Sequence, residues 1–478
     1  MLFNTLPFGL FFLLLLLLFY TLKSSCQSYL LLGASYLFYA FWSPIFLLLI
    51  LSSTLVDFFC GKAMSGRDKR RRLPFLLLSL LTNLGLLFYF KYQCFFLNDI
   101  CFGLFGFESC SSTDCVWLIV LPVGISFYTF QTLSYSIDIY KGELKAERNF
   151  FDFALFVSFF PQLVAGPIER AGNLLPQLKI VKSFDYALAV SGLRLFLWGL
   201  FKKIVIADRL GLIVDEVYSN VYAYHDLTLL LATLCFAVQI YCDFSGYSDM
   251  ALGIARCFGV RLSQNFDKPY FASSLRDFWR RWHITLSCWF RDYVYLPLGG
   301  SKKGLGRLFL AILIVFLLSG FWHGANWTFL AWGAVHGLIL ILEILFTKFV
   351  FNFTQSKNIG IKVSAWFLTF LIVLFTWVLF RSDSMADASY IYQQLFSFNF
   401  HWDAQLLDSF YIGKRGLLLA IGLIVFLFSI EAADIKWQLS TKFLLWPGYV
   451  RWVVYFVTVL IIIVLGVYET RPFIYFQF

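Results

Sequence analysis

Charged residues are scarce in this chain. Asp, Glu, Lys and Arg make up 14% of its 478 residues, whereas 60% of the residues are hydrophobic. A soluble domain is normally about 25% charged, so the composition argues against a soluble protein. The apolar residues cluster in runs of roughly 18 or more, the length that an α-helix needs to cross the hydrocarbon core. The short alternating segments of a β-barrel are missing. We therefore expect an all-α, polytopic integral membrane protein.

Several motifs of common enzymes and transporters are also missing. The chain has no Walker-type Gly-rich loop, no zinc-type ligand spacing and no Gly-x-Ser-x-Gly elbow. It has no pair of matching inverted halves, which many transporters carry. No bound cofactor or metal is expected. A net charge of +10 could suggest nucleic acid, but the basic residues lie between apolar runs, as the positive-inside rule produces. The expected partners of this charge are membrane lipids, and no nucleic-acid partner is expected.

Twelve apolar segments are candidate spans. The first is interpreted as a retained span, because it lacks the basic start and cleavage site of a signal peptide. The basic run at 61–72 is expected in the cytoplasm, and counting spans from it predicts that both termini are extracytoplasmic. The candidate segments are residues 6–22, 29–40, 44–60, 74–96, 115–140, 186–200, 228–257, 306–322, 328–345, 363–380, 417–435 and 449–467.

The middle of the chain does not fit a simple alternation of crossings. Between Lys145 and Lys302 parity requires an even number of spans, but three apolar segments are present, and segment 150–165 is short and contains Pro161. Irregular backbone at membrane depth survives only where protein or a wet cavity satisfies it. We therefore expect about 11–12 transmembrane helices plus re-entrant or interfacial helices, and a cavity in this region.

Three of the ten cysteines share one short acidic loop. Cys101, Cys110 and Cys115 lie in a loop predicted to be external, where one pair could form a disulfide. The pairing cannot be deduced from the sequence.

Histidine is rare, and two of the five histidines fall in "SGFWHGANWTFLAWGAVHG", between two long apolar runs. An ionisable residue at membrane depth is a functional hypothesis by default, and His323 is followed by the small residues Gly324 and Ala325. The alternative is a helix-packing face formed by Gly320 and Gly324, with a satisfied histidine. The neighbours of His323 do not decide between the two. For His336 a hydrogen bond to a backbone carbonyl is the favoured interpretation.

A second polar stretch is "LRDFWRRWHITLSCWFRDYVYLPLGGSKKG", residues 275–304. Its spacing predicts one helix that carries a polar stripe through His283 beside a stripe of tryptophans. An interfacial helix on lipid phosphates is the alternative. An imidazole can accept and donate a proton near neutral pH, and the surrounding arginines would attract an anionic donor such as a phosphate-bearing thioester. The polar stripe comprises Arg276, Arg280, His283, Ser287 and Arg291.

A third stretch, "QIYCDFSGYSDMALG", carries Asp243 and Asp249 within an apolar run. Buried carboxylates need partners, and the arginines of 276–291 are the expected ones. Structural ion pairing is favoured over charge relay to a histidine.

Together these motifs resemble one family. "DFWRRWHITLSCWFRDYVYLPLGG" and "SGFWHGANWTFLAWGAVHG", with "LPVGISFYTFQTLSYSIDIY", "FFPQLVAGPIER" and the terminal "FIYFQF", resemble the membrane-bound O-acyltransferase superfamily, in particular its bacterial alginate O-acetylation branch. The resemblance implies a single domain, 1–478, whose helices surround a tunnel or paired funnels. Its parts would be N-terminal helices 1–114, a catalytic core 115–348 and C-terminal helices 349–478.

The resemblance also implies a reaction. An acyl group, usually acetyl, would pass from a cytoplasmic thioester such as acetyl-CoA across the bacterial inner membrane. The acceptor would be an external polysaccharide such as alginate, cellulose or peptidoglycan, reached through an SGNH-type partner. Alternatives are a lipid or protein acyltransferase of the same superfamily, a proton-coupled transporter and a structural scaffold. The external acidic loop and the C-terminal tail are the expected docking surfaces.

In this interpretation His323 matches the catalytic histidine of the family, and His283 matches its second signature position. His323 would act as general base, and His283 would orient groups or hold the oxyanion together with nearby donors. The candidate substrate-binding residues are Asn326, Trp322, Trp279, Trp282, Arg280, Arg291, Tyr293, Asp243, Gln239 and His336.

Overall fold

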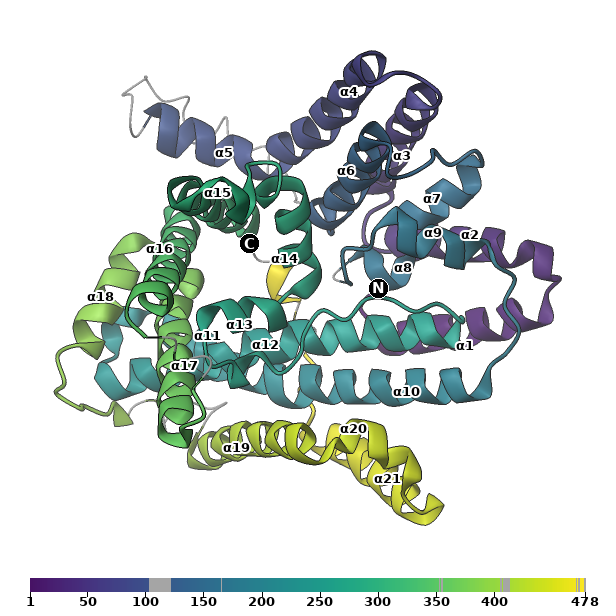
Figure 1. Ribbon diagram of the computed structural model, residues 1–478. Helices are drawn as coiled ribbons and strands as arrows, with labels where there is room; N and C mark the ends of the chain where they lie inside the picture. The colour runs from purple at the N-terminus through teal and green to yellow at the C-terminus, as the bar shows by residue number, and fades with distance from the viewer. Residues whose placement is uncertain are drawn as a thin grey trace.

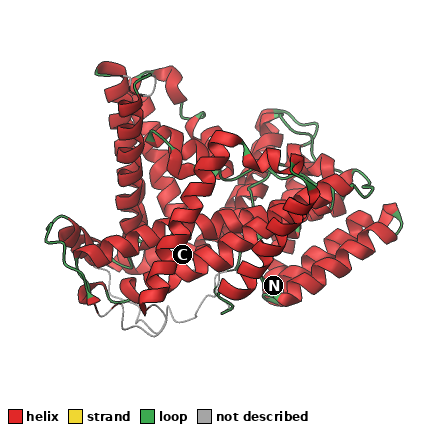
Figure 2. Ribbon diagram, turned by 90° about the horizontal axis from the view of Figure 1, so that it is seen from below, coloured by secondary structure: helices red, strands yellow, loops and turns green. Residues whose placement is uncertain are grey.

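The computed structural model describes residues 1–102, 122–164, 166–351, 353, 356–404, 406, 413–469, 471 and 473–476. Cys110, Cys115 and the side chain of Cys101 lie outside this part, and so does the disulfide expected among them. Within the described residues every regular element is helical, as Figures 1 and 2 show. The expected all-α class is confirmed.

Every apolar segment that was predicted as a span contains a helix. Among the described residues, eight helices are long and apolar enough to cross a membrane, so the chain is a multi-pass membrane protein. They are α3 (Pro44–Met64), the helix Lys69–Phe95 that begins with α4, α12 (Asp226–Cys257), α15 (Leu305–His323), α16 (Trp327–Phe349), α17 (Ile359–Arg381), α19 (Gly413–Trp437) and α21 (Gly448–Leu465).

The other four predicted spans contain shorter helices of 14 to 17 described residues. They are α1 (Leu6–Thr21), α2 (Gln27–Ala40), α6 (Ile125–Lys141) and α10 (Tyr186–Phe201). The irregular segment 150–165 forms two short helices, α7 (Phe150–Ser158) and α8 (Phe160–Leu163), of 9 and 4 residues. Neither is long enough to cross a membrane.

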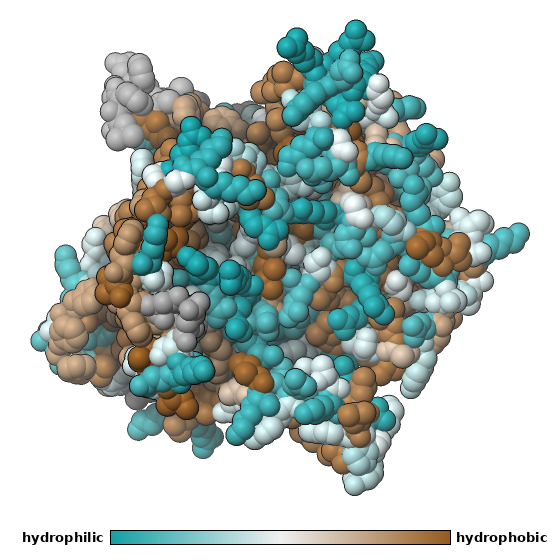
Figure 3. Space-filling view, in the orientation of Figure 1, coloured by the Kyte–Doolittle hydropathy of each residue, from teal (hydrophilic) through white to brown (hydrophobic). Residues whose placement is uncertain are grey.

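The long helices turn much of their apolar surface outward. Leu342, Leu418 and Trp452 are exposed on α16, α19 and α21. Figure 3 shows apolar side chains along the left flank of the molecule, whereas polar side chains gather across the middle of the same face. Exposed apolar side chains on long helices suit contact with lipid tails.

Helix α12 is the most buried of the candidate spans, and α10 runs beside it (Figure 1). The two helices touch through glycines: a Cβ on Gly199 would come within 2.4 Å of the carbonyl oxygen of Gly246. A Cβ on Gly253 would come within 2.5 Å of the carbonyl oxygen of Gly192. Small residues allow such close backbone contact, so the pair forms a tightly packed centre.

A similar contact joins α15 and α16. A Cβ on Gly320 would lie 2.3 Å from the carbonyl oxygen of Phe329, and a Cβ on Gly333 would lie 2.3 Å from that of Phe316. The crossing therefore admits only glycine at both positions. It lies one turn before His323, the last residue of α15, and so sets where this histidine enters the core.

Candidate functional site

The helix predicted around His283 is broken in two, so the expectation of one continuous stripe is wrong. Helix α13 (Leu275–Arg281) ends before Trp282, and α14 (Ile284–Phe290) begins after His283. His283 has a left-handed backbone, φ 42° and ψ 55°, a conformation that disfavours most residues but in which His, Asn and Asp are enriched. The break turns the imidazole inward, whereas Arg276, Arg280 and Arg291 stay exposed.

Asn265 causes this break. Its carbonyl oxygen accepts the N–H of Ile284 at 2.9 Å. Its side-chain Oδ1 accepts the N–H of Thr285 at 3.2 Å and the Thr285 hydroxyl at 2.9 Å. These bonds hold the start of α14 where α13 would otherwise continue into a third turn, which the side-chain spacing alone could not reveal.

The same oxygen orients the His283 ring. The Nδ1 of His283 lies 3.1 Å from Asn265 Oδ1. Because Oδ1 accepts the N–H of Thr285, it is the amide oxygen, and an amide oxygen can only accept; Nδ1 is therefore the protonated donor and Nε2 carries the lone pair. Nε2 is buried and has no hydrogen-bond partner among the described residues. A fixed tautomer with an available acceptor nitrogen is suited to proton transfer.

His323 is 2% exposed and lies in an aromatic environment. Its ring centroid is 5.0 Å from Trp322, 5.2 Å from Trp332 and 5.1 Å from Phe380. Its Nδ1 has no hydrogen-bond partner in the described part of the chain. Lys91 donates to the carbonyl oxygens of Trp322 and His323 at 2.8 and 3.0 Å, which places a cation at the carboxyl end of α15, where it is favoured.

Both alternatives for the "SGFWHG" stretch hold in part. Gly320 packs against α16 as a helix-packing face requires, and a Cβ on Gly324 would overlap the ring of Phe329. The expected satisfied histidine is not found, because Nδ1 of His323 lacks a partner among the described residues. Tight packing and an available imidazole therefore occur at the same place.

Trp322 connects the two histidines. Its ring centroid is 5.9 Å from that of His283 and 5.0 Å from that of His323. The indole N–H groups of Trp322 and Trp332 are buried without a hydrogen-bond partner among the described residues. We call His283, His323, Trp322 and Trp332 the histidine cluster. Buried polar groups are nearly always satisfied by protein or ordered water, so these four groups can each form a hydrogen bond with a water or a ligand.

His336 lies next to this cluster. Its ring is 4.8 Å from Trp332, 5.2 Å from Trp279 and 6.1 Å from Phe316. No hydrogen bond to its Nδ1 is found among the described residues, so the favoured carbonyl bond is not found at that nitrogen. Trp279 also has an unpartnered indole N–H. Trp282, by contrast, packs between Phe278 and Trp377, with ring centroids at 5.6 and 5.0 Å.

The side-chain amide of Asn326 makes structural hydrogen bonds. Its Oδ1 accepts the N–H of Thr328 at 3.1 Å and caps α16, and its Nδ2 donates to the carbonyl oxygen of Asp383 at 2.9 Å. Both ends of the amide are engaged, which argues against Asn326 as an oxyanion donor.

The arginines and the tyrosine predicted to bind substrate are exposed or paired with acidic residues. Arg280 is exposed. Arg291 pairs with Asp292 at 2.7 Å, and Arg170 pairs with the same carboxylate. Tyr293 donates to Asp138 at 2.8 Å. Burial raises the pKa of the Asp292 carboxyl, but hydrogen bonds from Arg291 and Arg170 outweigh burial and hold this pKa below its usual range.

The acidic residues of α12 have lysines as partners, so the expected pairing with the arginines of 276–291 is wrong. Asp243 pairs with Lys203 at 2.8 Å, and Asp249 pairs with Lys202 at 2.7 Å. The close glycine contact between α10 and α12 places these two lysines against α12. Gln239 also lies on α12, with its Nε2 2.8 Å from a Cβ on Gly211.

The C-terminal segment is a part of the site that the sequence did not reveal. It was expected on the surface, but Phe473 and Ile474 are 0% and 4% exposed. The N–H of Ile474 donates to Asp243 at 2.8 Å, and the Tyr475 ring is 5.5 Å from His323 and 4.6 Å from Phe244. The described part of the tail therefore forms a wall of the histidine cluster rather than a docking surface. Its aromatic run was the only signal in the sequence.

Known proteins similar to this chain are named for O-acetylation or D-alanyl transfer. A sequence model described as MBOAT, membrane-bound O-acyltransferase family, matches residues 37–381. A probable alginate O-acetylase AlgI of Pseudomonas syringae is 39% identical over 388 residues, 80% of this chain and 72% of the relative. A peptidoglycan O-acetyltransferase of Helicobacter pylori is 37% identical, covering 74% and 71%. A teichoic acid D-alanyltransferase of Streptococcus thermophilus is 28% identical, covering 54% and 68%.

Proposed function

Because the chain belongs to the membrane-bound O-acyltransferase family and is an acyltransferase, we propose that it transfers acetyl groups from a thioester to hydroxyls of an external polysaccharide. The observation that carries this proposal is the histidine cluster. Two buried imidazoles share Trp322, and each keeps a nitrogen without a hydrogen-bond partner among the described residues. Acyl transfer to a hydroxyl needs a base and oxyanion donors, and the cluster offers both.

In the proposed reaction His323 removes the proton from the acceptor hydroxyl. The hydroxyl oxygen then attacks the thioester carbonyl, and the carbonyl oxygen becomes an oxyanion that the indole N–H of Trp322 or Trp332 stabilises. When the oxyanion collapses, the C–S bond breaks and the new C–O ester bond remains. The thiolate takes the proton that His323 carries and leaves as a thiol. The fixed Nε2 acceptor of His283 orients the incoming group.

The donor side of the reaction is assigned to the basic surface around α14. This helix has seven residues, so it is about 10 Å long. It joins the buried His283, just before its start, to the exposed Arg291, just after its last residue. Arg170 lies beside Arg291 on Asp292. We propose that these guanidinium groups attract the phosphates of a cytoplasmic donor such as acetyl-CoA.

The proposed acceptor is inferred from the names of similar proteins. Two of them are named for O-acetylation of alginate and of peptidoglycan, and we propose a polysaccharide acceptor of this kind at the bacterial inner membrane. Both termini would be extracytoplasmic, and a tunnel between the two faces would pass the histidine cluster. An SGNH-type partner would complete transfer to the polymer.

The test uses the purified protein in lipid nanodiscs with radiolabelled acetyl-CoA. We expect thioester consumption and acetyl transfer to depend on His323, and His323→Ala to lower the rate by about 10²–10⁴-fold, the usual contribution of general base catalysis. The melting temperature of the variant serves as the folding control. A well-folded His323→Ala protein with a near-normal rate would refute the role of His323.

The same assay separates the alternatives. Faster turnover of long-chain acyl thioesters than of acetyl-CoA would favour a lipid or protein acyltransferase of the same family. Movement of a substrate across the bilayer without loss of its acyl group would favour a transporter. Full partner-dependent polymer acetylation with a His323→Ala protein would favour a scaffold.

A further inference from the structure

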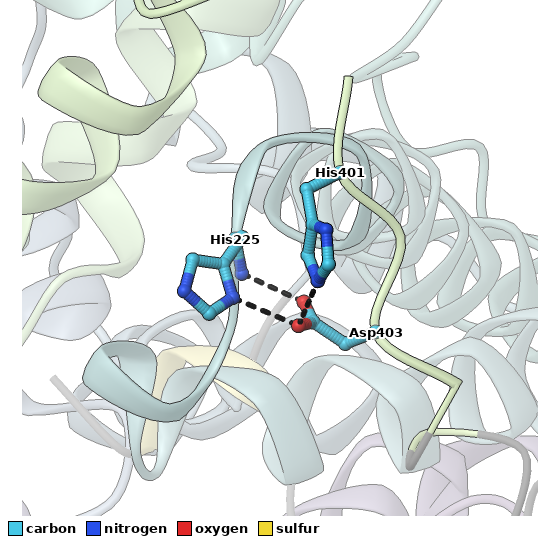
Figure 4. Close-up of side chains that lie close together, drawn as sticks. All are labelled: His225, His401 and Asp403. Atoms are coloured by element: carbon cyan, nitrogen blue, oxygen red, sulfur yellow. Dashed lines mark hydrogen bonds and ion pairs between the residues drawn. The ribbon is translucent and has the colours of Figure 1, made fainter. Parts of the chain in front are cut away.

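A second group of histidines lies outside the histidine cluster, on the surface. His225 immediately precedes α12, and His401 and Asp403 lie in the segment after α18 (Met385–Leu395). Figure 4 shows both imidazole rings turned toward the Asp403 carboxylate. Each residue offers one ligand atom, and the three atoms lie within 4.8 Å of one another. The family match ends at residue 381, so two of the three residues lie beyond it.

The distances are close to those of a metal centre. His225 Nδ1 is 2.8 Å from Asp403 Oδ1, and His401 Nε2 is 3.6 Å from the same oxygen. Ligands held tetrahedrally at 2.0–2.1 Å from zinc would be separated by about 3.4 Å. Small rotations of the two rings would therefore bring all three atoms into one coordination sphere. The rings can rotate, because the His225 and His401 side chains are 47% and 60% exposed.

The charge of the site also suits a cation. The Asp403 side chain is 6% exposed, and within the described part of the chain its only ion-pair partners are the two histidines. No lysine or arginine neutralises this carboxylate there. A buried carboxylate needs a compensating cation or hydrogen bonds, and a divalent ion bound to two neutral imidazoles would supply the charge.

The carboxylate is oriented by neighbouring groups. The backbone N–H of His225 donates to Asp403 Oδ2 at 2.7 Å, and the N–H of Asp403 donates to the Thr228 hydroxyl at 3.1 Å. The N–H of His401 donates to Asp226 at 3.3 Å. Contacts that fix the ligands in this way accompany protein metal sites. Phe398 and Phe400, just before His401, have φ of 55°. Coordination of an ion by His401 would help to stabilise this unfavourable backbone conformation.

We propose that His225, His401 and Asp403 bind one divalent transition-metal ion of the zinc class. Two imidazoles and one carboxylate are borderline ligands that suit Zn²⁺, whereas Mg²⁺ and Ca²⁺ prefer oxygen ligands alone. The ion would fasten the start of α12 to the segment after α18, with a fourth position left to water. Its role is to hold two distant segments of the chain together, apart from the acyl-transfer site.

The test is zinc titration of the full-length protein, purified through a tag without histidines and first treated with a chelator. We expect saturable binding of one Zn²⁺ per chain by calorimetry, and a visible absorption band when Co²⁺ replaces zinc. Zinc should also raise the melting temperature. Excess Mg²⁺ should not compete.

Two variants separate a metal site from a simple hydrogen bond. His225→Asn retains a side-chain donor for Asp403 but removes the imidazole, and together with His401→Ala it should abolish both zinc binding and the zinc-dependent rise in melting temperature. Ser397→Ala is the matched control, because the Ser397 hydroxyl lies in the same loop as His401 and donates to Asp226 of α12 at 2.7 Å, but supplies no ligand. This control should bind zinc normally. The proposal is overturned if the wild type binds no stoichiometric zinc, or if the double variant binds it equally well.

Discussion

The Nδ1 of His283 donates to the Oδ1 of Asn265 at 3.1 Å, across 18 positions of the chain. That oxygen also accepts both the N–H and the hydroxyl of Thr285. One amide therefore breaks the helix, sets the tautomer of the imidazole and directs its free nitrogen into the histidine cluster. Asn265 acts through His283, so it is a positioning residue.

Replacing Asn265 should affect both stability and turnover. In Asn265→Ala the buried donors of His283 and Thr285 lose their acceptor, which should lower the free energy of unfolding by about 1–3 kcal/mol. The ring of His283 is then free to change tautomer, so kcat for acetyl transfer should fall while KM changes little. Asn83→Ala is the matched control, because Asn83 is a buried amide that bonds Asp57 in a different polar network. This control should lose stability with a smaller change in kcat, and equal loss of kcat in both variants would contradict the role of Asn265.

The backbone at His283 predicts an order among its substitutions. A β-branched residue at φ 42° is strongly disfavoured, whereas Asn tolerates this region. We expect His283→Val to be less stable than His283→Asn by about 1–2 kcal/mol, as chemical denaturation in detergent would measure. Both variants should lose activity, because neither supplies an imidazole. The same pair of substitutions at His336, within α16, should lack this preference for Asn, and a similar gap there would show that the backbone is not the cause.

The C-terminal segment should be required for a stable core. Phe473 is fully buried and contacts Phe244 and Tyr247, with ring centroids at 5.4 and 5.2 Å. Phe473→Ala should lower stability by about 3–5 kcal/mol, the usual range for a buried phenylalanine, and should lower acetyl transfer. Phe473→Leu is the conservative control and should retain most of both properties. If Phe473→Ala melts and turns over like the wild type, the tail is not part of the core.

The Asp292 ion pairs predict a dependence of stability on acid. The folded pKa of Asp292 is lowered, because the bonds from Arg291 and Arg170 outweigh burial. Its stabilising contribution is therefore fully present above the ordinary aspartate pKa of about 3.9 and is lost as the pH falls through the lower folded pKa. The gap in melting temperature between wild type and Asp292→Asn should be constant from pH 5 to pH 8 and should shrink below about pH 4. A gap that widens in acid would mean that Asp292 is not the stabilised carboxylate.

Local sequence patterns were enough to predict the long apolar helices and to single out His323. Long apolar runs predicted the helices because burial in lipid leaves few other backbone conformations, and the scarcity of histidine drew attention to His323. The break at His283 was not predictable in this way. The spacing of Arg276, Arg280 and Arg291 fits an uninterrupted helix, and the group that overrides it, Asn265, lies in a preceding loop with no distinctive pattern.

Contacts between distant segments account for the other differences. Asp243 was expected to pair with arginines about 40 residues ahead in the sequence, but a glycine contact brings Lys203 to it. His225 and Asp403 are separated by 178 positions, so no spacing rule could have linked them. The packing of whole helices determines which distant residues come into contact, and a single sequence carries little information about that packing.

The glycine crossing of α15 and α16 has a consequence for how this enzyme can change. His323 begins one turn beyond Gly320, and Gly320 and Gly333 each lie where a Cβ would meet backbone at 2.3 Å. Even an alanine there must push the two helices apart, and that movement would reach the imidazole directly. Neither glycine has a side chain with which to touch a substrate, yet together they limit how the reaction centre can be adjusted. New acceptors are therefore more easily gained by altering the walls around His323 than by moving the histidine itself.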